Sequence, residues 1–299
     1  MKLLDRISNH IRRKNMQKDS EGRGQAQRID YIIDEDTPFD VTEAFRNLKA
    51  TLSVSVPKKS GGVAIMTSSA YPREGKTTVA VNLALMFAIS DAKVVLIDTD
   101  LRKGRVAKYF KRKRVPGLSD YLSGQAELEE VVHHSHINEN LSYITCGTRS
   151  PRPYELLESE EMKAFIEEMK EKYDYVIIDT PPVLMVSDAL ALATAVDGAV
   201  LICRHQVSFV SDISRALSAL RFAKANVLGV VVNDYKAPQR GKYYGNYKKY
   251  YYYNNYGYTY GSTKAEDKED DLAVEELSKD TKKTTDKKNN KGFEKKHKK

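Results

Sequence analysis

The chain has 299 residues, of which 41% are apolar, a formal net charge of +8 and two cysteines. This length suits one large α/β domain with extensions, or two small domains. No apolar run reaches the roughly eighteen residues that a membrane-spanning helix needs, and the N-terminus has no secretory signal. The two cysteines, Cys146 and Cys203, have no second ligand or partner nearby in the sequence. We therefore exclude a membrane-spanning or disulfide-stapled protein and predict a cytoplasmic one with reduced thiols.

Composition divides the chain into four parts. Residues 1–28 are polar and basic, and we predict an extension there that does not fold. A cationic amphipathic helix within residues 3–14, in contact with a membrane surface, is an equally weighted alternative. The folded core is predicted at 29–236, followed by a tyrosine-rich segment at 237–263 and a charged, disordered segment at 264–299.

Six apolar runs follow one another along the core, and segments with helical spacing separate them. We predict strands at 63–69, 93–98, 141–145, 175–179, 198–203 and 227–233, and a surface helix and loop at 127–136. Regular alternation of strands and helices is typical of an α/β fold with a doubly wound, mostly parallel sheet. Because ligands of such sheets bind beyond the carboxyl ends of the strands, we expect the functional site at that edge.

The segment between the first run and the next helical pattern reads Ala70-Tyr71-Pro72-Arg73-Glu74-Gly75-Lys76-Thr77. A loop of this kind holds phosphates with its backbone N–H groups and its lysine, and the Thr hydroxyl is placed to hold Mg²⁺. Ala70 replaces the glycine of the general pattern, and isolated Gly-Lys-Thr sequences are common, so the loop alone leaves a purely structural interpretation open. The predicted nucleotide-binding residues are Arg73, Glu74, Gly75, Lys76, Thr77 and Thr78.

Two later strands end in carboxylates. The second run leads into Asp98-Thr99-Asp100-Leu101-Arg102, and the fourth ends at Asp179. Since parallel strands end at one edge of the sheet, these carboxylates are expected beside the phosphate loop, where Asp179 is the natural outer-sphere partner of Mg²⁺. The three motifs in this order favour nucleotide binding over a coincidence of core strands.

The base of the nucleotide is predicted from the end of the last strand. We find no guanine-reading Asn-Lys-x-Asp sequence, which favours ATP. Asn233, at the end of the sixth run, is a candidate adenine contact, with a simple turn residue as the alternative.

Ten of the 19 tyrosines lie between residues 243 and 260, and no acidic residue occurs from 237 to 263. Gly, Asn and Lys interleave the rings, so the segment cannot form an ordinary core. It is read as a cluster of phosphate acceptors, as an aromatic surface for single-stranded nucleic acid, or as a sticky low-complexity tail. The cluster consists of Tyr243, Tyr244, Tyr247, Tyr250, Tyr251, Tyr252, Tyr253, Tyr256, Tyr258 and Tyr260.

In these combined motifs the chain resembles the bacterial tyrosine kinases, in the form found as a separate cytoplasmic protein of Gram-positive capsule and exopolysaccharide systems. The resemblance covers roughly residues 40–260 and rests on the phosphate loop 70–77, the acidic motif 95–102, the strand 176–179 and the terminal tyrosines. The first three features also occur in related partition and division-site ATPases. The tail separates the two groups.

The resemblance implies a P-loop NTPase fold with ATP and Mg²⁺ as ligands. Lys76 would hold the phosphates and Asp98 would accept the proton of a tyrosine hydroxyl. Thr77 and Asp100 or Asp179 would support Mg²⁺. Asp100, Asp179 and Arg102 would complete the catalytic group. The ten tail tyrosines would be the phosphate acceptors.

A further family element is an acidic residue followed at three-residue intervals by two basic ones, used for self-association into a ring. It corresponds here to Glu43, Arg46 and Lys49, with lysine in place of the second arginine. The three charges share one helical face, and the ordinary interpretation is a pair of surface ion pairs worth about 0.2–0.5 kcal/mol each. Lysine also lacks the bidentate fork of arginine. We expect a homo-oligomer, in the form of a ring.

We predict an ATP-dependent protein-tyrosine autokinase that phosphorylates its own tail and regulates the synthesis and export of capsular or extracellular polysaccharide. The resemblance implies a membrane-bound activator of the polysaccharide co-polymerase type, a cognate tyrosine phosphatase and a peripheral position at the inner face of the cell membrane. No sequence-specific nucleic acid is expected. The alternatives are a partition- or division-site-type ATPase with a binding tail, and a nucleic-acid-binding module built around the tail.

Overall fold

The computed structural model describes residues 31–56 and 61–235. The chain divides into two units, residues 1–236 and 237–299, and all described residues belong to the first. The predicted N-terminal extension, the ten tail tyrosines and the charged C-terminal segment therefore lie outside the described residues. Among the described residues, no helix is both long and apolar enough to cross a membrane.

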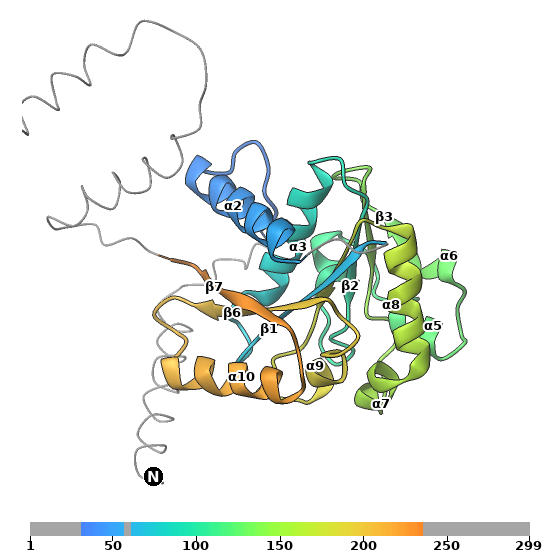
Figure 1. Cartoon of the computed structure of the whole chain (residues 1–299). Coiled ribbons are helices and arrows are strands. Elements are labelled where there is room, and N and C mark those ends of the chain that lie inside the picture. Colours follow the sequence, from blue (N-terminus) through green and yellow to red (C-terminus); the bar gives the residue numbers. More distant parts are fainter. Residues whose placement is uncertain (1–30, 57–60, 236–299) are drawn as a thin grey trace, which may run out of the picture. The chain divides into compact units, whose positions relative to one another are not determined.

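A seven-stranded sheet forms the centre of the described unit (Figure 1). Its spatial order is β3-β4-β2-β5-β1-β6-β7. All neighbouring strands are parallel except β3, which runs antiparallel to β4. The predicted α/β fold with a mostly parallel sheet is confirmed. The strands are β1 (Val63–Ser69), β2 (Val94–Asp98), β3 (Val132–His134), β4 (Leu141–Ile144), β5 (Tyr175–Asp179), β6 (Gly198–Arg204) and β7 (Val227–Asn233).

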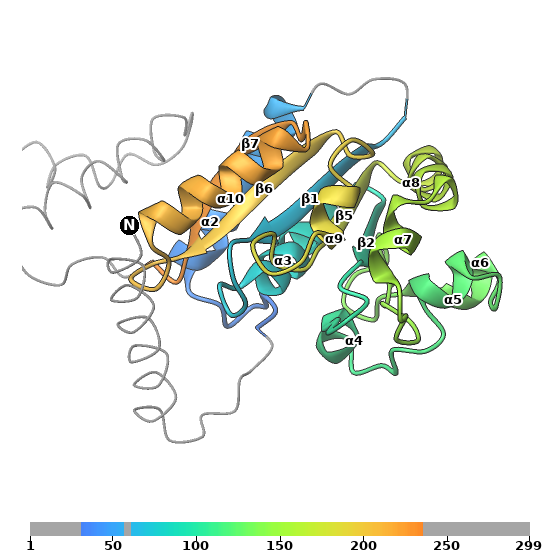
Figure 2. The same cartoon turned by 90° about the horizontal axis from the view of Figure 1, so that it is seen from below.

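Helices cover both faces of the sheet. In Figure 1, α2 and α3 lie above the strands and α10 lies below them. The helix α8 packs on the same face as α10, and Figure 2 shows the two toward opposite ends of the sheet. The described helices are α2 (Phe39–Ser55), α3 (Lys76–Ala88), α4 (Val106–Tyr109), α5 (Leu118–Leu122), α6 (Leu128–Val131), α7 (Pro153–Glu158), α8 (Glu160–Lys172), α9 (Asp188–Ala191) and α10 (Val210–Phe222).

The alternation of side chains along each strand divides the buried residues into two cores. In β1, Ile65 packs in the core under α2 and α3, whereas its neighbours Ala64 and Met66 pack in the core under α8 and α10. All seven residues of β1 are buried, as expected for a central strand covered on both faces. Burial of a central strand along its whole length is therefore a consequence of the doubly wound arrangement.

One predicted region differs from the structure. Residues 127–136 were expected to form a surface helix and loop, but after the short helix α6 the chain forms β3, which pairs with β4 from Val132↔Ile144 to His134↔Ser142. This strand is three residues long, carries two histidines and is partly exposed. Its sequence therefore lacks the apolar run that identifies the central strands.

Candidate active site

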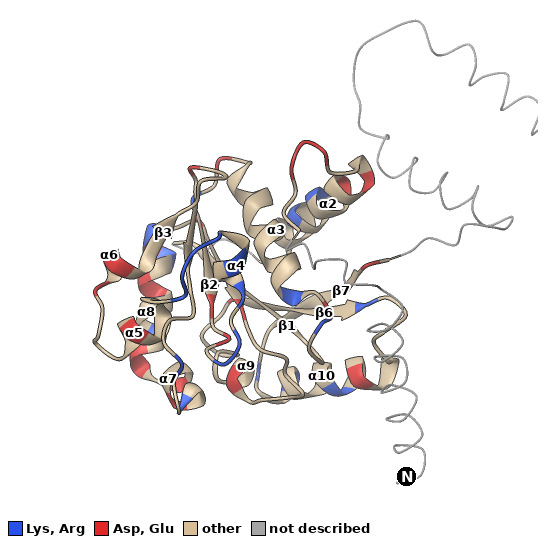
Figure 3. Ribbon diagram, turned by 180° about the vertical axis from the view of Figure 1, so that it is seen from behind, with Lys and Arg blue, Asp and Glu red and all other residues tan. Residues whose placement is uncertain are grey.

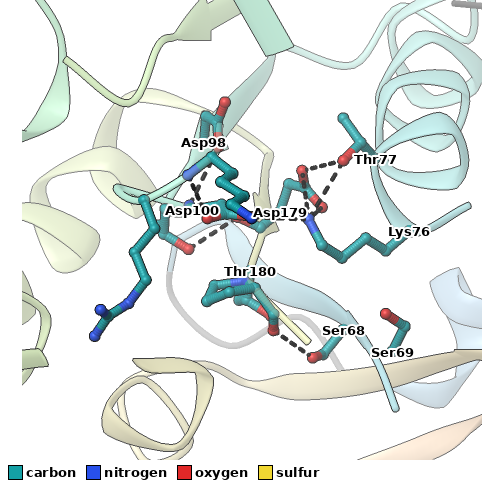
Figure 4. Close-up of polar contacts among 12 residues, drawn as sticks. Ser68, Ser69, Lys76, Thr77, Asp98, Asp100, Asp179 and Thr180 are labelled. Carbon is teal, nitrogen blue, oxygen red and sulfur yellow. Dashed lines mark hydrogen bonds and ion pairs between the residues drawn. The ribbon is translucent and has the colours of Figure 1, made fainter. Parts of the chain in front are cut away.

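Three adjacent strands bring the predicted site residues to one edge of the sheet. β5 lies between β1 and β2, and its last residue, Asp179, is in register with Thr67 of β1 and with Asp98 of β2. The loop that follows β1 leads directly into α3, which begins at Lys76. Figure 4 shows Lys76 and Thr77 pointing toward Asp179, with Asp98 and Asp100 on the other side of it.

The phosphate loop is held by the side chain of Glu74, which is only 2% exposed. Its Oε2 accepts a hydrogen bond from the backbone N–H of Tyr71 at 2.8 Å, and its Oε1 accepts one from the Ser208 hydroxyl at 2.6 Å. The Nδ2 of Asn233 donates to the Glu74 carbonyl oxygen at 3.1 Å. Because its carboxylate is occupied by these donors, Glu74 braces the loop with its side chain and faces a ligand only with its backbone.

Gly75 makes the turn into α3 possible. Its φ of 95° lies in the left-handed region, and a side chain at this position would clash with the Nδ2 of Asn233. Gly75 also provides no side-chain cap for α3. The first N–H groups of this 13-residue helix therefore open toward the site, as in other helix N-termini that bind phosphate.

Lys76 lies among carboxylates. Its Nζ is 3.3 Å from Oδ1 of Asp179 and 3.6 Å from Oδ2 of Asp100. Burial alone would lower the pKa of this ammonium group, but the neighbouring carboxylates, Asp179 first among them, outweigh burial and raise its pKa. The hydroxyl of Thr77 donates to Oδ2 of Asp179 at 2.6 Å. Lysine and threonine thus hold the same carboxylate.

Asp98 is a fully buried carboxylate held by the backbone. Its Oδ1 accepts from the N–H of Asp100 at 3.2 Å and its Oδ2 from the N–H of Val106 at 3.0 Å. Burial, and then the charge of Asp179, raise the pKa of Asp98 to about 8. The adjacent Cys146 thiol has its pKa raised to about 12, by burial and then by Asp98, so we assign this thiol no reactive role.

Arg102 forms a bidentate ion pair with a residue that the sequence motifs did not identify. Its Nε and Nη2 donate to Asp188 of α9 at 2.8 and 3.0 Å, and Asp188 is fully buried. This bond, before other effects, raises the pKa of the guanidinium group. Asp188 could have been noticed as the one carboxylate within the mostly apolar stretch 183–196, but its partner could not be identified from spacing.

The structure thus gathers part of the predicted set. Lys76, Thr77, Asp98, Asp100 and Asp179 lie together, and Asn233 contacts the phosphate loop. Arg73 is exposed on that loop with a φ of 73°, and the hydroxyl of Thr78 is 2.7 Å from that of Tyr109.

The predicted ring residues lie away from this edge, on α2. Glu43 and Arg46 form an ion pair with each other. Lys49 instead turns toward its own chain and donates to the Ser90 hydroxyl at 3.0 Å. The side chain of Arg46 is 61% exposed. Of the two basic residues, Arg46 is therefore the one that is accessible to a neighbouring copy of the chain.

The raised pKa of Asp98 predicts how the stability of the protein depends on pH. Between its ordinary pKa of 3.8 and about 8, the folded protein keeps a proton that the unfolded chain releases. The free energy of unfolding should therefore decrease as pH rises through this interval. We expect the melting temperature to fall from pH 5 to pH 8, and Asp98→Asn to reduce this slope.

The same variant tests the geometry at Asp98 by its absolute stability. An asparagine amide facing the N–H of Val106 loses one hydrogen bond, at a cost of about 1–3 kcal/mol. A destabilised Asp98→Asn protein with an unchanged pH slope would contradict a protonated Asp98. The measurement is a melting series by circular dichroism in buffers of equal ionic strength.

Residues 73–220, which include every carboxylate of the site, match a family model described as an AAA domain. The tyrosine-protein kinase YwqD of Bacillus subtilis strain 168 is 36% identical over 203 residues, which cover 68% of this chain and 84% of YwqD. The chain belongs to the bacterial tyrosine-protein kinases. The family predicted from the sequence motifs is thereby confirmed.

Two further members of this kinase family agree with the assignment. The putative tyrosine-protein kinase EpsB of Ralstonia solanacearum is 34% identical over 235 residues, or 78% of this chain. The solved kinase domain of the Escherichia coli tyrosine kinase ETK has a TM-score of 0.61 and 31% identity, covering 73% of this chain and 90% of that domain. The chain spans about a third of the length of EpsB, since the match covers 31% of that kinase.

Proposed function

We propose that the protein is an ATP-dependent tyrosine kinase that phosphorylates the tyrosine cluster of a neighbouring copy of itself. The observation that carries the proposal is a phosphate loop whose lysine faces Asp98, Asp100 and Asp179, in a chain of the tyrosine-kinase family. Phosphoryl transfer depends mainly on positioning and on neutralising charge, and these residues are the means for both.

The nucleotide phosphates fit the start of α3. Backbone N–H groups of its first turn face the site, and Lys76 is the ammonium group that would reach the outer phosphates. In the structure this ammonium is shared between Asp179 and Asp100. ATP binding would therefore draw Lys76 away from these carboxylates and leave them without their present partner.

The residues present fit Mg²⁺. Thr77, Asp179 and Asp100 offer only oxygen atoms, and the two buried aspartates next to Asp98 leave an excess of negative charge around one ammonium group. No group of three His, Cys, Asp or Glu side chains within residues 31–56 and 61–235 could hold a metal alone. Phosphate oxygens and water would complete the shell, and the bound ion would neutralise charge on the transferred phosphoryl group.

The acceptor tyrosine must lose a proton as its oxygen bonds to the γ-phosphorus and the bond to the ADP oxygen breaks. We assign this proton to the ionised form of Asp98, whose share grows as the pH approaches its pKa of about 8. Asp100 is the alternative acceptor, since it lies on the same loop and is slightly exposed. A pH profile of the transfer rate in Asp98→Asn and Asp100→Asn distinguishes the two assignments.

The physiological setting is proposed from the family resemblance. Acceptors would be the ten tyrosines between residues 243 and 260, presented within a ring of copies that associate through Glu43, Arg46 and Lys49. A membrane-bound activator of the polysaccharide co-polymerase type would switch the kinase on, and a tyrosine phosphatase would reverse it. The process regulated would be synthesis and export of capsular or extracellular polysaccharide, with the kinase held peripherally at the inner face of the membrane by its partner.

The test mixes two chains that are each unable to phosphorylate themselves. One is a Lys76→Met chain that keeps its tail, and the other is an active chain truncated after Lys236. With ATP and Mg²⁺, and with membranes of the source organism added in a parallel sample, we expect phosphotyrosine on the Lys76→Met chain. Site-resolved mass spectrometry should place it between residues 243 and 260.

Two results would contradict the proposal. Hydrolysis of ATP without phosphotyrosine in any sample would favour the partition- or division-site-type ATPase. Phosphotyrosine in wild-type protein, but none on the Lys76→Met chain, would exclude transfer between copies.

A further inference from the structure

The segment that follows the acidic motif is strongly basic. Eight of the thirteen residues from 102 to 114 are Lys or Arg, and none is Asp or Glu. We call these residues the basic segment. In Figure 3 the colour of Lys and Arg marks α4 and the loops on both sides of it. Seven of its cations are exposed. One of them, Arg102, pairs with Asp188, and the other six are Lys103, Arg105, Lys108, Lys111, Arg112 and Lys113.

Within the part of the chain that the structure describes, no carboxylate forms an ion pair with any of these six cations. Elsewhere on the described surface, exposed lysines such as Lys163 and Lys172 pair with a glutamate on their own helix. The basic segment thus carries a concentrated positive charge that the described surface leaves unneutralised. A surface of this kind attracts acidic partners and raises their local concentration.

The backbone under these cations is firmly held. The hydroxyl of Tyr109 contacts that of Thr78 at 2.7 Å, and the ring of Phe110 stacks on Tyr143 with centroids 4.0 Å apart. At the end of the segment, the Nε of Arg114 donates to the Gly147 carbonyl oxygen at 2.7 Å. The buried residues between the cations are Val106, Ala107, Tyr109 and Phe110. The charges therefore project from an anchored segment.

The same segment is bonded to the site. The N–H of Val106 donates to Asp98, and that of Lys103 donates to Oδ1 of Asp100 at 2.9 Å. A polypeptide lying on the basic segment would consequently lie beside the proposed proton acceptor and the phosphate loop. The site itself is acidic and its border is basic. This arrangement favours a substrate polypeptide that places a neutral tyrosine hydroxyl in the site and acidic residues against the basic border.

We propose that the basic segment is a docking surface for acidic polypeptide, and that it selects protein substrates whose acceptor tyrosine is flanked by Asp and Glu. This inference rests on the proposed kinase function, and names a class of substrate separate from the chain's own tail. The tail segment 237–263 has no acidic residue, so it reaches the site without help from these cations. The same site would thus accept two classes of substrate, acidic polypeptides that bind the basic segment and the chain's own tail, which does not.

The test uses the full chain and two labelled peptides, each with one central tyrosine, flanked by Asp and Glu in one and by Ser and Gly in the other. Binding is measured by fluorescence anisotropy at low salt without nucleotide, so it does not depend on catalysis. We expect the acidic peptide to bind at least about tenfold more tightly. The triple variant Lys108→Glu, Lys111→Glu, Lys113→Glu should lose this preference, and the corresponding triple Gln variant should reduce it.

A matched control variant changes the net charge by the same amount at positions away from the carboxyl ends of the strands. Lys93, Lys172 and Arg221 are exposed, and Lys93→Glu, Lys172→Glu, Arg221→Glu should leave the preference unchanged. In kinase assays the first triple variant should raise KM for the acidic peptide while the phosphorylation of the tail is retained or increased. Equal loss in both triple variants would show a net-charge effect and overturn the proposal.

Three other outcomes are also informative. Binding of phosphatidylglycerol vesicles and of a single-stranded oligonucleotide is measured in parallel. If either binds more tightly than the acidic peptide, and the triple Glu variant abolishes that binding, acidic polypeptide is not the partner. Phosphorylation of the tail without any preference between the peptides would overturn this inference alone. Absence of phosphotyrosine in every sample would contradict the proposed kinase function, while the binding comparison would still test the docking surface.

Discussion

Lys76→Met is expected to lower phosphotyrosine formation by about 10²–10³-fold, the usual effect of removing one preorganised charge partner from a transition state. Lys76 begins α3, and its ammonium is the cation that the described structure places among Asp98, Asp100 and Asp179. Methionine has a similar length without charge, so packing at the start of the helix should be retained. The measurement is the initial rate of phosphotyrosine formation at saturating ATP.

Lys93→Met is the matched control, because Lys93 is exposed at the opposite end of β2. It should leave the rate unchanged. Lys76 lowers the pKa of Asp179 against the stronger effect of burial, so the folded Lys76→Met protein should also lose more stability on raising the pH than wild type does. A folded Lys76→Met protein with normal phosphotyrosine yield would remove Lys76 from the site.

Asp179→Asn is expected to raise the Mg²⁺ concentration needed for nucleotide binding by about 10–100-fold, the effect that loss of a supporting carboxylate has in metal sites. Asp179 is fully buried at the end of β5 and accepts the Thr77 hydroxyl at 2.6 Å. An asparagine oxygen can keep that hydrogen bond, so the change removes charge more than structure. A fluorescent ADP analogue titrated with Mg²⁺ gives the midpoint directly.

The control here is Asp91→Asn, an exposed position whose φ of 61° asparagine tolerates well. It should leave the Mg²⁺ midpoint where wild type has it. Nucleotide binding by Asp179→Asn with an unchanged midpoint would exclude Asp179 from metal support and shift that role to Asp100 and Thr77.

The central strands and the site at their carboxyl ends could be predicted because the information is local. Each of these buried strands is an apolar run that ends in a carboxylate, Asp98 in β2 and Asp179 in β5. The partners of these residues could not be predicted in the same way. Ser208 lies 134 positions from Glu74, and Asp188 lies 86 positions from Arg102. Such pairs depend on how two loops meet after the sheet has formed.

β3 was missed for a different reason. Its identity as a strand comes from hydrogen bonding to β4 rather than from its own composition, since Val132–His134 is short and polar. The anchoring of the basic segment was likewise invisible in the sequence. A run of Lys and Arg usually indicates a solvated loop, and only the buried side chains of Val106, Tyr109 and Phe110 show that this one is fixed.

The bond from Asn233 to the Glu74 carbonyl links the outermost strand to the phosphate loop. Among the described strands β7 pairs with β6 alone, and its side chains are only partly covered, so it is among the places where a sheet opens most easily. Fraying of this edge would release the amide that supports Glu74. The affinity for nucleotide is thereby coupled to the local stability of β7, and a substitution at the sheet edge can weaken ligand binding without touching any residue that contacts the ligand.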